Sequence, residues 1–409
     1  MKDVIRSITR RRWLALGAGV PAGLACSATA QSAPQPPPGG APVAPVAIAK
    51  VRAYDEDLVA VVRRMFDQIG GLQAQVQGKT IAVKVNLTGG NNFAGYSAGE
   101  THWVHPRVVG AVTAVLGGLG AKRIRILESA GSRRADYQLE DKLLQGGWDV
   151  NAIRNAAQLV EFEDTNGLGF GKQYSTLKVK SKPYIFPAFN LNHSYEDCDF
   201  LISLGKAKNH EEMGVTMAIK NMFGVTPAAL YGGRERIFHY GQVQAPAGAP
   251  AEIDPLSNRY EGWRLPRILV DIIGARPVDL AISDAIISTC GGEGPWVLGA
   301  KPIHPGFLVA GRNVVNTDAV TMAAMGYNPR AGRHEAPYRV YKGPGNHPKE
   351  QLAPADEKFQ YADNMMLLAE AAGIGSADLN RIEVRGVSIR EAMFDFEAYW
   401  KNQMPKDKG

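Results

Sequence analysis

The sequence predicts an α/β fold with a mostly parallel sheet and helices on both of its faces. Short segments rich in β-branched residues alternate with longer helix-like segments, and this order is typical of parallel sheets. With 409 residues, of which 45% are hydrophobic, the chain is long enough for one large domain or for two lobes.

The elements follow one another along most of the chain. Residues 80–87 (TIAVKVNL) predict a strand because they are rich in Val, Ile and Thr. Residues 107–119 predict a helix, since a proline stands at the start and a glycine follows the end. The remaining predictions are strands at 123–127 and 161–163, a strand at 199–204 with a helix at 213–223, a helix at 267–273, strands at 279–283 and 306–310, helices at 317–325 and 356–372, and a strand at 382–385.

The N-terminal segment has the composition of an export signal. Residues 9–14 (TRRRWL) resemble a twin-arginine motif, a short apolar run follows, and residues 28–30 (ATA) offer a cleavage site. An ordinary secretory signal is the alternative. We expect residues 1–30 to be a signal peptide and 31–47 a Pro/Ala-rich linker. Residues 48–402 would then fold as one α/β domain in the periplasm or another extracytoplasmic compartment.

Charge and cysteine content narrow the choice of partners. Five basic residues and one acid lie in the first twelve positions, so most of the net charge of +6 belongs to the leader. No basic stripe with interleaved aromatic residues indicates a nucleic-acid partner. Cys198 and Cys290 lack metal-finger or iron–sulfur spacing, and they are compatible with a disulfide or with two free thiols. No later apolar segment is long enough for a stable membrane span. The expected partners are a small anionic molecule and, during export, the twin-arginine translocase.

Residues 199–224 predict an anion-binding site, because a cationic loop joins a predicted strand to a predicted helix there. The predicted helix would place Thr216 and Lys220 on one face, because they are four positions apart. Lys84 and Asn86 at the end of the first strand share a face by the period of two. A solvated loop is the alternative for this segment. The residues expected to bind an anionic substrate or cofactor are Lys84, Asn86, Lys206, Lys208, Thr216, Lys220 and Asn221.

Acidic residues near other strand ends are the candidates for chemistry. Asp284 leaves a predicted strand, and Glu293 stands among glycines that permit close backbone approach to a ligand. Together with His210 they are the predicted catalytic residues, acting as general acid/base groups or as ligands of a divalent metal. Asp318 starts a predicted helix, where an acid is expected for structural reasons, and it is a further metal candidate. His102, three residues before His105 in a loop, offers another metal alternative.

Several segments resemble the DUF362 family, whose activity is unassigned. The similarity spans about residues 80–400, and the block at 199–224 is the most specific. The family's K-x-K-x-H element is Lys206-Ala-Lys208-Asn-His210 here. Members often carry iron–sulfur motifs or a ferredoxin module, and this chain has neither motif. The resemblance extends distantly to the architecture of lactate racemase, a nickel-pincer enzyme. The matching segments are KVNL at 84–87, HPRVVGAV at 105–112, ILESAG at 126–131, DFLISLGKAKNH at 199–210, VTMAIKNMFG at 215–224, DAIISTCGGEGP at 284–295 and NVVNTDAVTMAAMG at 313–326.

Together these features predict an exported enzyme of unassigned reaction. It would bind an anionic substrate or cofactor in a site built from Lys, His, Asp and Glu, with or without a divalent metal. The alternative is an extracytoplasmic solute-binding protein that uses the same cationic pocket without chemistry. The acids beside His210 favour an enzyme, because a simple anion binder gains little from buried carboxylates.

Overall fold

The computed structural model describes residues 40–90, 92–129, 139–168, 173–231, 250–297, 299–341 and 359–403. Their main feature is an eight-stranded sheet with the order β16-β1-β13-β10-β7-β2-β3-β4. The strands are β1 (Val46–Lys50), β2 (Thr80–Lys84), β3 (Arg123–Glu128), β4 (Val160–Asp164), β7 (Phe200–Lys206), β10 (Leu280–Ala285), β13 (Phe307–Gly311) and β16 (Val384–Gly386).

Five adjacent strands, β10, β7, β2, β3 and β4, run parallel to one another, and β16 is parallel to β1. Strand β13 is antiparallel to both of its neighbours, β1 and β10. The predicted mostly parallel α/β sheet is therefore confirmed.

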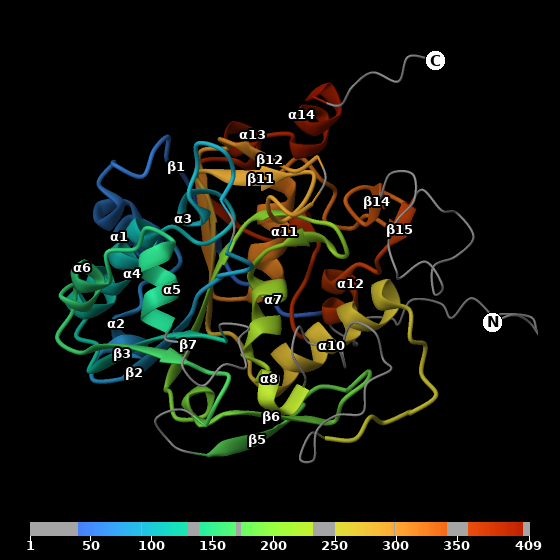
Figure 1. Ribbon diagram of the computed structural model, residues 1–409, viewed down its shortest axis with the longest axis horizontal. Coiled ribbons are helices and arrows are strands. Elements are labelled where there is room, and N and C mark those ends of the chain that lie inside the picture. The colour runs from blue at the N-terminus through green and yellow to red at the C-terminus, as the bar shows by residue number, and fades with distance from the viewer. Residues whose placement is uncertain are drawn as a thin grey trace, which may run out of the picture. The chain divides into compact units, whose positions relative to one another are not determined.

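Helices cover both faces of the sheet (Figure 1). On one face lie α1 (Leu58–Gln68) and α4 (Pro106–Gly118), and on the other lie α7 (Ala218–Asn221), α10 (Glu261–Ala275), α11 (Val314–Ala324) and α12 (Met365–Ala371). Side chains alternate between two hydrophobic cores, as the pleat of a strand requires. In β2, Ile81 and Val83 belong to the core under α1 and α4, whereas Ala82 belongs to the other core.

Shorter elements surround this sandwich. The short helices are α2 (Gln73–Val76), α3 (Ala98–Thr101), α5 (Leu139–Gln145), α6 (Val150–Arg154), α8 (Ala228–Tyr231), α13 (Ile389–Ala392) and α14 (Phe396–Gln403), with 3-10 turns at His193–Tyr195, Met222–Val225 and Leu379–Arg381. Four two-stranded sheets pair β5 (Tyr174–Lys178) with β6 (Ala188–Asn192), β8 (Lys208–His210) with β9 (Gly214–Thr216), β11 (Ser288–Cys290) with β12 (Lys301–Ile303), and β14 (Arg339–Tyr341) with β15 (Phe359–Tyr361). No helix within the described ranges is both long and apolar enough to cross a membrane.

The helix predicted at 213–223 is wrong. Residues 214–216 pair with 208–210 as an antiparallel hairpin, and the helix α7 covers only Ala218–Asn221 before a 3-10 turn. Gly214 adopts a φ of 74°, which favours glycine and turns the chain between the two strands. Thr216 therefore lies in a strand, and it does not share a helix face with Lys220.

Two other predicted boundaries also shift. Helix α11 begins at Val314 with Asn313 as its N-cap, so Asp318 lies inside the helix rather than at its start. In the described part of 356–372, strand β15 precedes α12, where the sequence predicts one continuous helix.

A strand that the sequence does not predict lies at the N-terminal end of the domain. β1 includes the last two residues of the predicted linker, and the Pro42 carbonyl and the Ala44 amide bond to Ser376 and Asn316. The end of this segment is thus part of the packed fold. Residues 1–39, which include the predicted signal peptide, lie outside the described part of the chain. Cys198 and Cys290 are free thiols rather than a disulfide.

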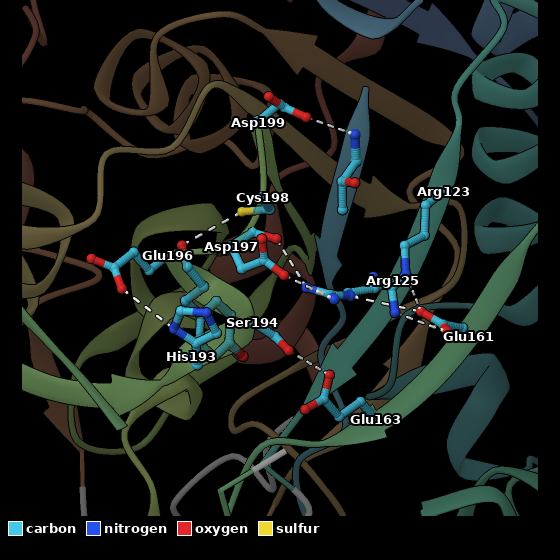
Figure 2. Close-up of polar contacts among 12 residues, drawn as sticks. Arg123, Arg125, Glu161, Glu163, His193, Ser194, Glu196, Asp197, Cys198 and Asp199 are labelled. Atoms are coloured by element: carbon cyan, nitrogen blue, oxygen red, sulfur yellow. Dashed lines mark hydrogen bonds and ion pairs between the residues drawn. The ribbon is translucent and has the colours of Figure 1, made fainter. Parts of the chain in front are cut away.

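Ion pairs cluster at the amino ends of β3, β4 and β7 (Figure 2). Arg123 Nε lies 2.5 Å from Glu161 Oε2, and Arg125 Nη2 lies 3.1 Å from Asp197 Oδ2. Arg125 is buried, whereas Asp197 is more than half exposed, so solvent weakens the pair. This edge of the sheet holds neighbouring segments together, and the predicted site residues lie at the opposite edge.

Candidate functional site

The predicted site residues gather where β2, β7 and β10 end. These three strands are neighbours and run parallel, so their carboxyl ends lie at one edge of the sheet. In register, Lys84 is opposite Ser203 and Asp284 is opposite Lys206. The seven predicted binding residues, the three predicted catalytic residues and Asp318 are all buried, including the four lysines. A buried lysine requires compensating partners, and these partners differ from one lysine to the next.

Lys206 belongs to a closed cluster on the α1 and α4 side of the sheet. Its Nζ lies 2.8 Å from Asp284 Oδ2 and 2.7 Å from the Tyr54 hydroxyl, which itself lies 3.0 Å from Asp284 Oδ1. The His105 ring stacks on Tyr54 at 3.5 Å, and the His105 amide donates to Asp284. Burial lowers the pKa of Lys206, and the Asp284 carboxylate opposes that change. Lys206 and Asp284 therefore neutralise each other, and neither is an open ligand group.

Lys84 forms a second buried ion pair. Its Nζ lies 2.7 Å from Glu128 Oε1 and also donates to the Val85 carbonyl. Glu128 ends β3 and accepts backbone amides of Leu87 and Ser129. Burial raises the pKa of Glu128, and Lys84 opposes the change. This lysine is therefore tied to a structural partner that the sequence analysis did not identify.

Asn221 connects this ion pair to α7. Its Oδ1 accepts from Lys84 Nζ and from Asn86 Nδ2, and its Nδ2 donates to the Lys84 carbonyl and to Ser203 Oγ. Both polar atoms of the Asn221 side chain thus have hydrogen-bond partners within the protein. Lys84 and Asn86 contact the same partner, as expected for residues on one face of a strand.

Lys208 differs from the other two lysines on the strands. Its Nζ is fully buried and donates to the His102 carbonyl at 2.5 Å, and no carboxylate of the described residues forms an ion pair with it. Burial lowers the pKa of Lys208 to about 7, with Glu293 raising it and Lys206 and Lys220 lowering it further. The amine can therefore exist in both charge states near neutral pH.

His210 lies beside Glu293, two positions beyond Lys208. The His210 Nδ1 accepts the Glu212 amide at 3.1 Å and lies 3.9 Å from Glu293 Oε2. Burial lowers the pKa of His210 to about 3, so the ring is neutral at physiological pH. Because Nδ1 is an acceptor, the ring proton lies on Nε2.

Glu293 is held in place by donors. The Glu211 amide donates to Oε2 and the Trp296 indole to Oε1, and Trp296 packs against Gly89 and Gly294, where a Cβ would collide with its ring. Burial raises the pKa of Glu293, but nearby His210 and these hydrogen bonds outweigh that effect and lower it overall. Glu293 is therefore ionised beside a neutral imidazole.

The N-terminus of α7 does not form the predicted anion site. Asp318 Oδ1 and Oδ2 accept the amides of Ala218 and Ile219 at 2.9 and 2.8 Å, so the protein's own carboxylate already occupies this helix end. The helix is also only four residues long. Thr216 has a buried hydroxyl without a hydrogen-bond partner in the described residues.

The four metal candidates are placed in three different surroundings. Asp284 contacts Lys206, Asp318 caps α7, and only His210 and Glu293 are neighbours. In the described parts of the chain, no three His, Cys, Asp or Glu residues are arranged to hold a metal ion. The arrangement instead resembles a proton-transfer site, with a titratable amine next to an imidazole and a carboxylate.

Two members of the site were not singled out from the sequence. Glu128 carried a detectable signal, because it ends a strand next to the one that ends in Lys84. Tyr54 carried none, since it lies in the segment between β1 and α1 and reaches Asp284 across 230 positions of sequence.

A cavity of about 590 Å³ adjoins the Lys206 cluster on the α1 and α4 side. His105 and Glu100 line it together with the first residues of α1 and α4. The carboxylates of Asp57 and Asp149 in its wall already accept amides at the starts of α1 and α6. With four acidic side chains in its wall, this cavity does not suit an anion.

The sequence model of the family DUF362, a domain of unknown function, matches residues 81–323 of the chain. The chain belongs to the DUF362 family. A curated relative of this DUF362 protein is the thylakoid-associated protein sll1697 of Synechocystis sp. (strain ATCC 27184 / PCC 6803 / Kazusa). It is 26% identical over 325 residues, which cover 75% of this chain and 84% of the relative.

Two solved structures are similar to this DUF362 protein. Lactate racemase apoprotein from Thermoanaerobacterium thermosaccharolyticum has a TM-score of 0.35 at 12% identity, covering 64% of this chain and 54% of that chain. A protein from Thermotoga maritima has a TM-score of 0.35 at 15% identity, covering 59% and 52%. The chain thus matches about half the length of each.

Proposed function

We propose that this DUF362 protein is an exported enzyme that moves a proton on a small anionic molecule, with Lys208 as the base and His210 as a hydrogen-bond donor to the developing charge. The observation that carries the proposal is the burial of Lys208 without a carboxylate partner. This lysine is a buried amine that no carboxylate of the described residues neutralises, at the edge of the sheet where α/β proteins bind ligands. A base with a pKa near the operating pH combines a large neutral fraction with a useful driving force.

The reaction step balances within the site. The neutral Nζ of Lys208 takes a proton from the bound molecule, and the electron pair stays on the substrate. The charge that develops there is stabilised by the new ammonium and by Lys220, which lies close enough to influence both Lys208 and His210. The Nε2–H of His210 donates a hydrogen bond to the substrate atom on which the charge develops, and ionised Glu293, 3.9 Å from Nδ1, keeps that proton on the ring. The Lys208 ammonium then returns its proton to the substrate, which completes the transfer.

Lys206 and Asp284 position the site and take no part in the proton transfer. Their ion pair fixes the end of β7 against β10, one residue before the segment that carries Lys208 and His210. A ligand would approach past His210 and Lys220, which are 8% and 9% exposed, because Lys208 itself has no exposed surface.

Hydrogen exchange tests the proposal while the substrate is still unidentified. We expect the protein in D2O to exchange a C–H proton of one component in a mixture of small carboxylates and phosphate esters, observed by proton NMR. The rate should rise as pH increases through about 7, because Lys208 loses its proton there. Lys208→Met should show no exchange, whereas Lys122→Met, a change at an exposed lysine, should match the wild type.

The alternative, a solute-binding protein without chemistry, predicts a different pattern of losses. For an enzyme, His210→Ala and Glu293→Gln should keep ligand affinity within about tenfold while turnover disappears. Calorimetry and exchange rates on the same preparations would separate the two quantities. Loss of affinity in both variants, with no exchange ever detected in the wild type, would establish the binding protein instead.

Export is proposed from the N-terminal sequence. We expect Arg10→Lys combined with Arg11→Lys to leave the protein folded in the cytoplasm, because twin-arginine transport depends on the arginine pair. Fractionation of cells that express the wild type and the double variant would measure this. Normal export of the variant would favour the general secretory route.

A further inference from the structure

Two buried hydrogen-bond acceptors of the site lack a donor within the described chain. Asn86 Oδ1 and His102 Nε2 are buried, and nothing in the described residues donates to either atom. Their residues are 6% and 0% exposed, so bulk water does not satisfy them. Buried acceptors without donors reduce stability, and their presence at a site therefore suggests a missing partner.

The orientation of Asn86 is fixed by its neighbours. Asn221 must direct Nδ2 at the Lys84 carbonyl and Oδ1 at the Lys84 ammonium. The flipped amide would place its oxygen against the carbonyl oxygen and its NH2 group against the ammonium. Asn221 Oδ1 then requires a donor from Asn86, at 3.2 Å, so Asn86 presents Nδ2 to it. A flip of the Asn86 amide would bring two oxygens together. Its Oδ1 is therefore an acceptor by necessity.

The tautomer of His102 is fixed in the same way. Thr101 donates its hydroxyl to the Ser97 carbonyl, which leaves its oxygen to accept from His102 Nδ1 at 3.0 Å. Nδ1 thus carries the ring proton, and Nε2 has a free electron pair. Trp296 and Phe93 surround the ring edge-on, and neither offers a donor to Nε2.

The two acceptors lie at the two ends of one loop: Asn86 shares Asn221 with Lys84, and His102 contacts Lys208. The Val104 amide donates to the Asn86 carbonyl, which closes the segment between the two residues into a loop. The His102 carbonyl accepts from Lys208 Nζ. The proposed proton-transfer groups are therefore accompanied by two neutral acceptors that no described group of the protein uses.

We infer that the ligand is an anion that also carries hydroxyl or amine hydrogen-bond donors, which Asn86 Oδ1 and His102 Nε2 accept. This inference rests on the proposed function and specifies the substrate class of the same site. A site built to accept donors discriminates strongly against analogues that lack them, because its own buried groups are then left unpaired.

Four dicarboxylates provide matched probes. Succinate has no donor on its carbon chain, malate has one hydroxyl, aspartate has one ammonium group and tartrate has two hydroxyls. Calorimetry with the wild-type protein should show tartrate binding at least about tenfold more tightly than succinate, with malate and aspartate between them. The order of malate and aspartate would identify the preferred donor.

His102→Phe tests the residue itself, because phenylalanine keeps a flat ring beside Trp296 and removes the acceptor. It should bring the affinities for tartrate and succinate together while succinate affinity stays unchanged. His304→Phe, at an exposed histidine, should keep the wild-type ratio.

Failure of this inference can be told apart from failure of the proposed function. If wild-type protein binds succinate and tartrate equally, the anion site stands and the inference is wrong, with water filling the acceptors. If none of the four binds at millimolar concentration, the inference is wrong, and the hydrogen-exchange assay with phosphate esters decides separately whether the proposed function stands. The wild-type ratio decides this even where a variant does not fold.

Discussion

Lys84→Met is expected to reduce the free energy of unfolding by about 3–5 kcal/mol, because it leaves the Glu128 carboxylate buried without its cation. Equilibrium denaturation by urea would measure the loss. Glu128 still accepts the Leu87 and Ser129 amides, so the variant should retain the fold. Exposed Lys79, 3.6 Å from Asp199, is the matched control, and Lys79→Met should change stability by no more than about 1 kcal/mol.

A second substitution and the pH dependence of the loss test whether the unpaired Glu128 carboxylate causes the lower stability of Lys84→Met. Adding Glu128→Gln to Lys84→Met should recover much of the loss, since a neutral amide needs no counter-ion. Burial raises the pKa of Glu128, so folded protein takes up its proton at a higher pH than unfolded protein. The deficit of the single variant should therefore shrink as pH falls toward about 4.3, the unfolded value for Glu. A deficit that is independent of pH and unaffected by Glu128→Gln would contradict the assigned pair.

Lys208→Met is expected to raise the free energy of unfolding at pH 7 by roughly 3–4 kcal/mol while it abolishes activity. Burial lowers the pKa of Lys208 from 10.5 to about 7, and each tenfold change in a proton dissociation constant corresponds to about 1.36 kcal/mol. Methionine removes that cost and loses only one hydrogen bond to the His102 carbonyl. A functional residue that destabilises its own protein is common at active sites.

The pH dependence of stability shows directly whether folding lowers the pKa of Lys208. Between pH 7 and 10.5 the unfolded chain keeps the Lys208 proton and the folded protein does not, so unfolding takes up a proton there and stability rises with pH. The slope from this lysine is at most about 1.4 kcal/mol for each step of one in pH. Lys208→Met should lack that contribution, whereas Lys122→Met should follow the wild type. Parallel profiles for all three proteins would show that Lys208 remains charged in the fold.

Much of the central sheet could be predicted because its strands are continuous apolar runs, as strands buried on both faces must be. The edge of the sheet that holds the site could also be predicted, since polar residues follow the ends of β2, β7 and β10. The hairpin of β8 and β9 could not, because the charge of the segment favours a loop and a helix. The alternation of Lys206, Lys208 and His210 nevertheless has the period of a strand.

The partners of the lysines could not be predicted, because they come from distant parts of the sequence. Glu128 was detectable only as an acid at the end of the strand after the one that carries Lys84, and nothing near Lys206 points to Tyr54. Sequence shows four cations as equivalent candidates for anion binding. Burial and pairing separate them, since Lys84 and Lys206 have carboxylate partners and Lys208 has none among the described residues.

The contact between Asp318 and the start of α7 has a consequence for biosynthesis. It joins residues about 100 positions apart, so α7 remains uncapped until the ribosome has released β13 and the first half of α11. Long-range contacts of this kind form late, and N-terminal intermediates lack them. A nascent chain would thus have all five parallel strands from β2 to β10 before Asp318 can cap α7. The helix that carries Asn221 would reach its final position only after residue 318 has left the ribosome.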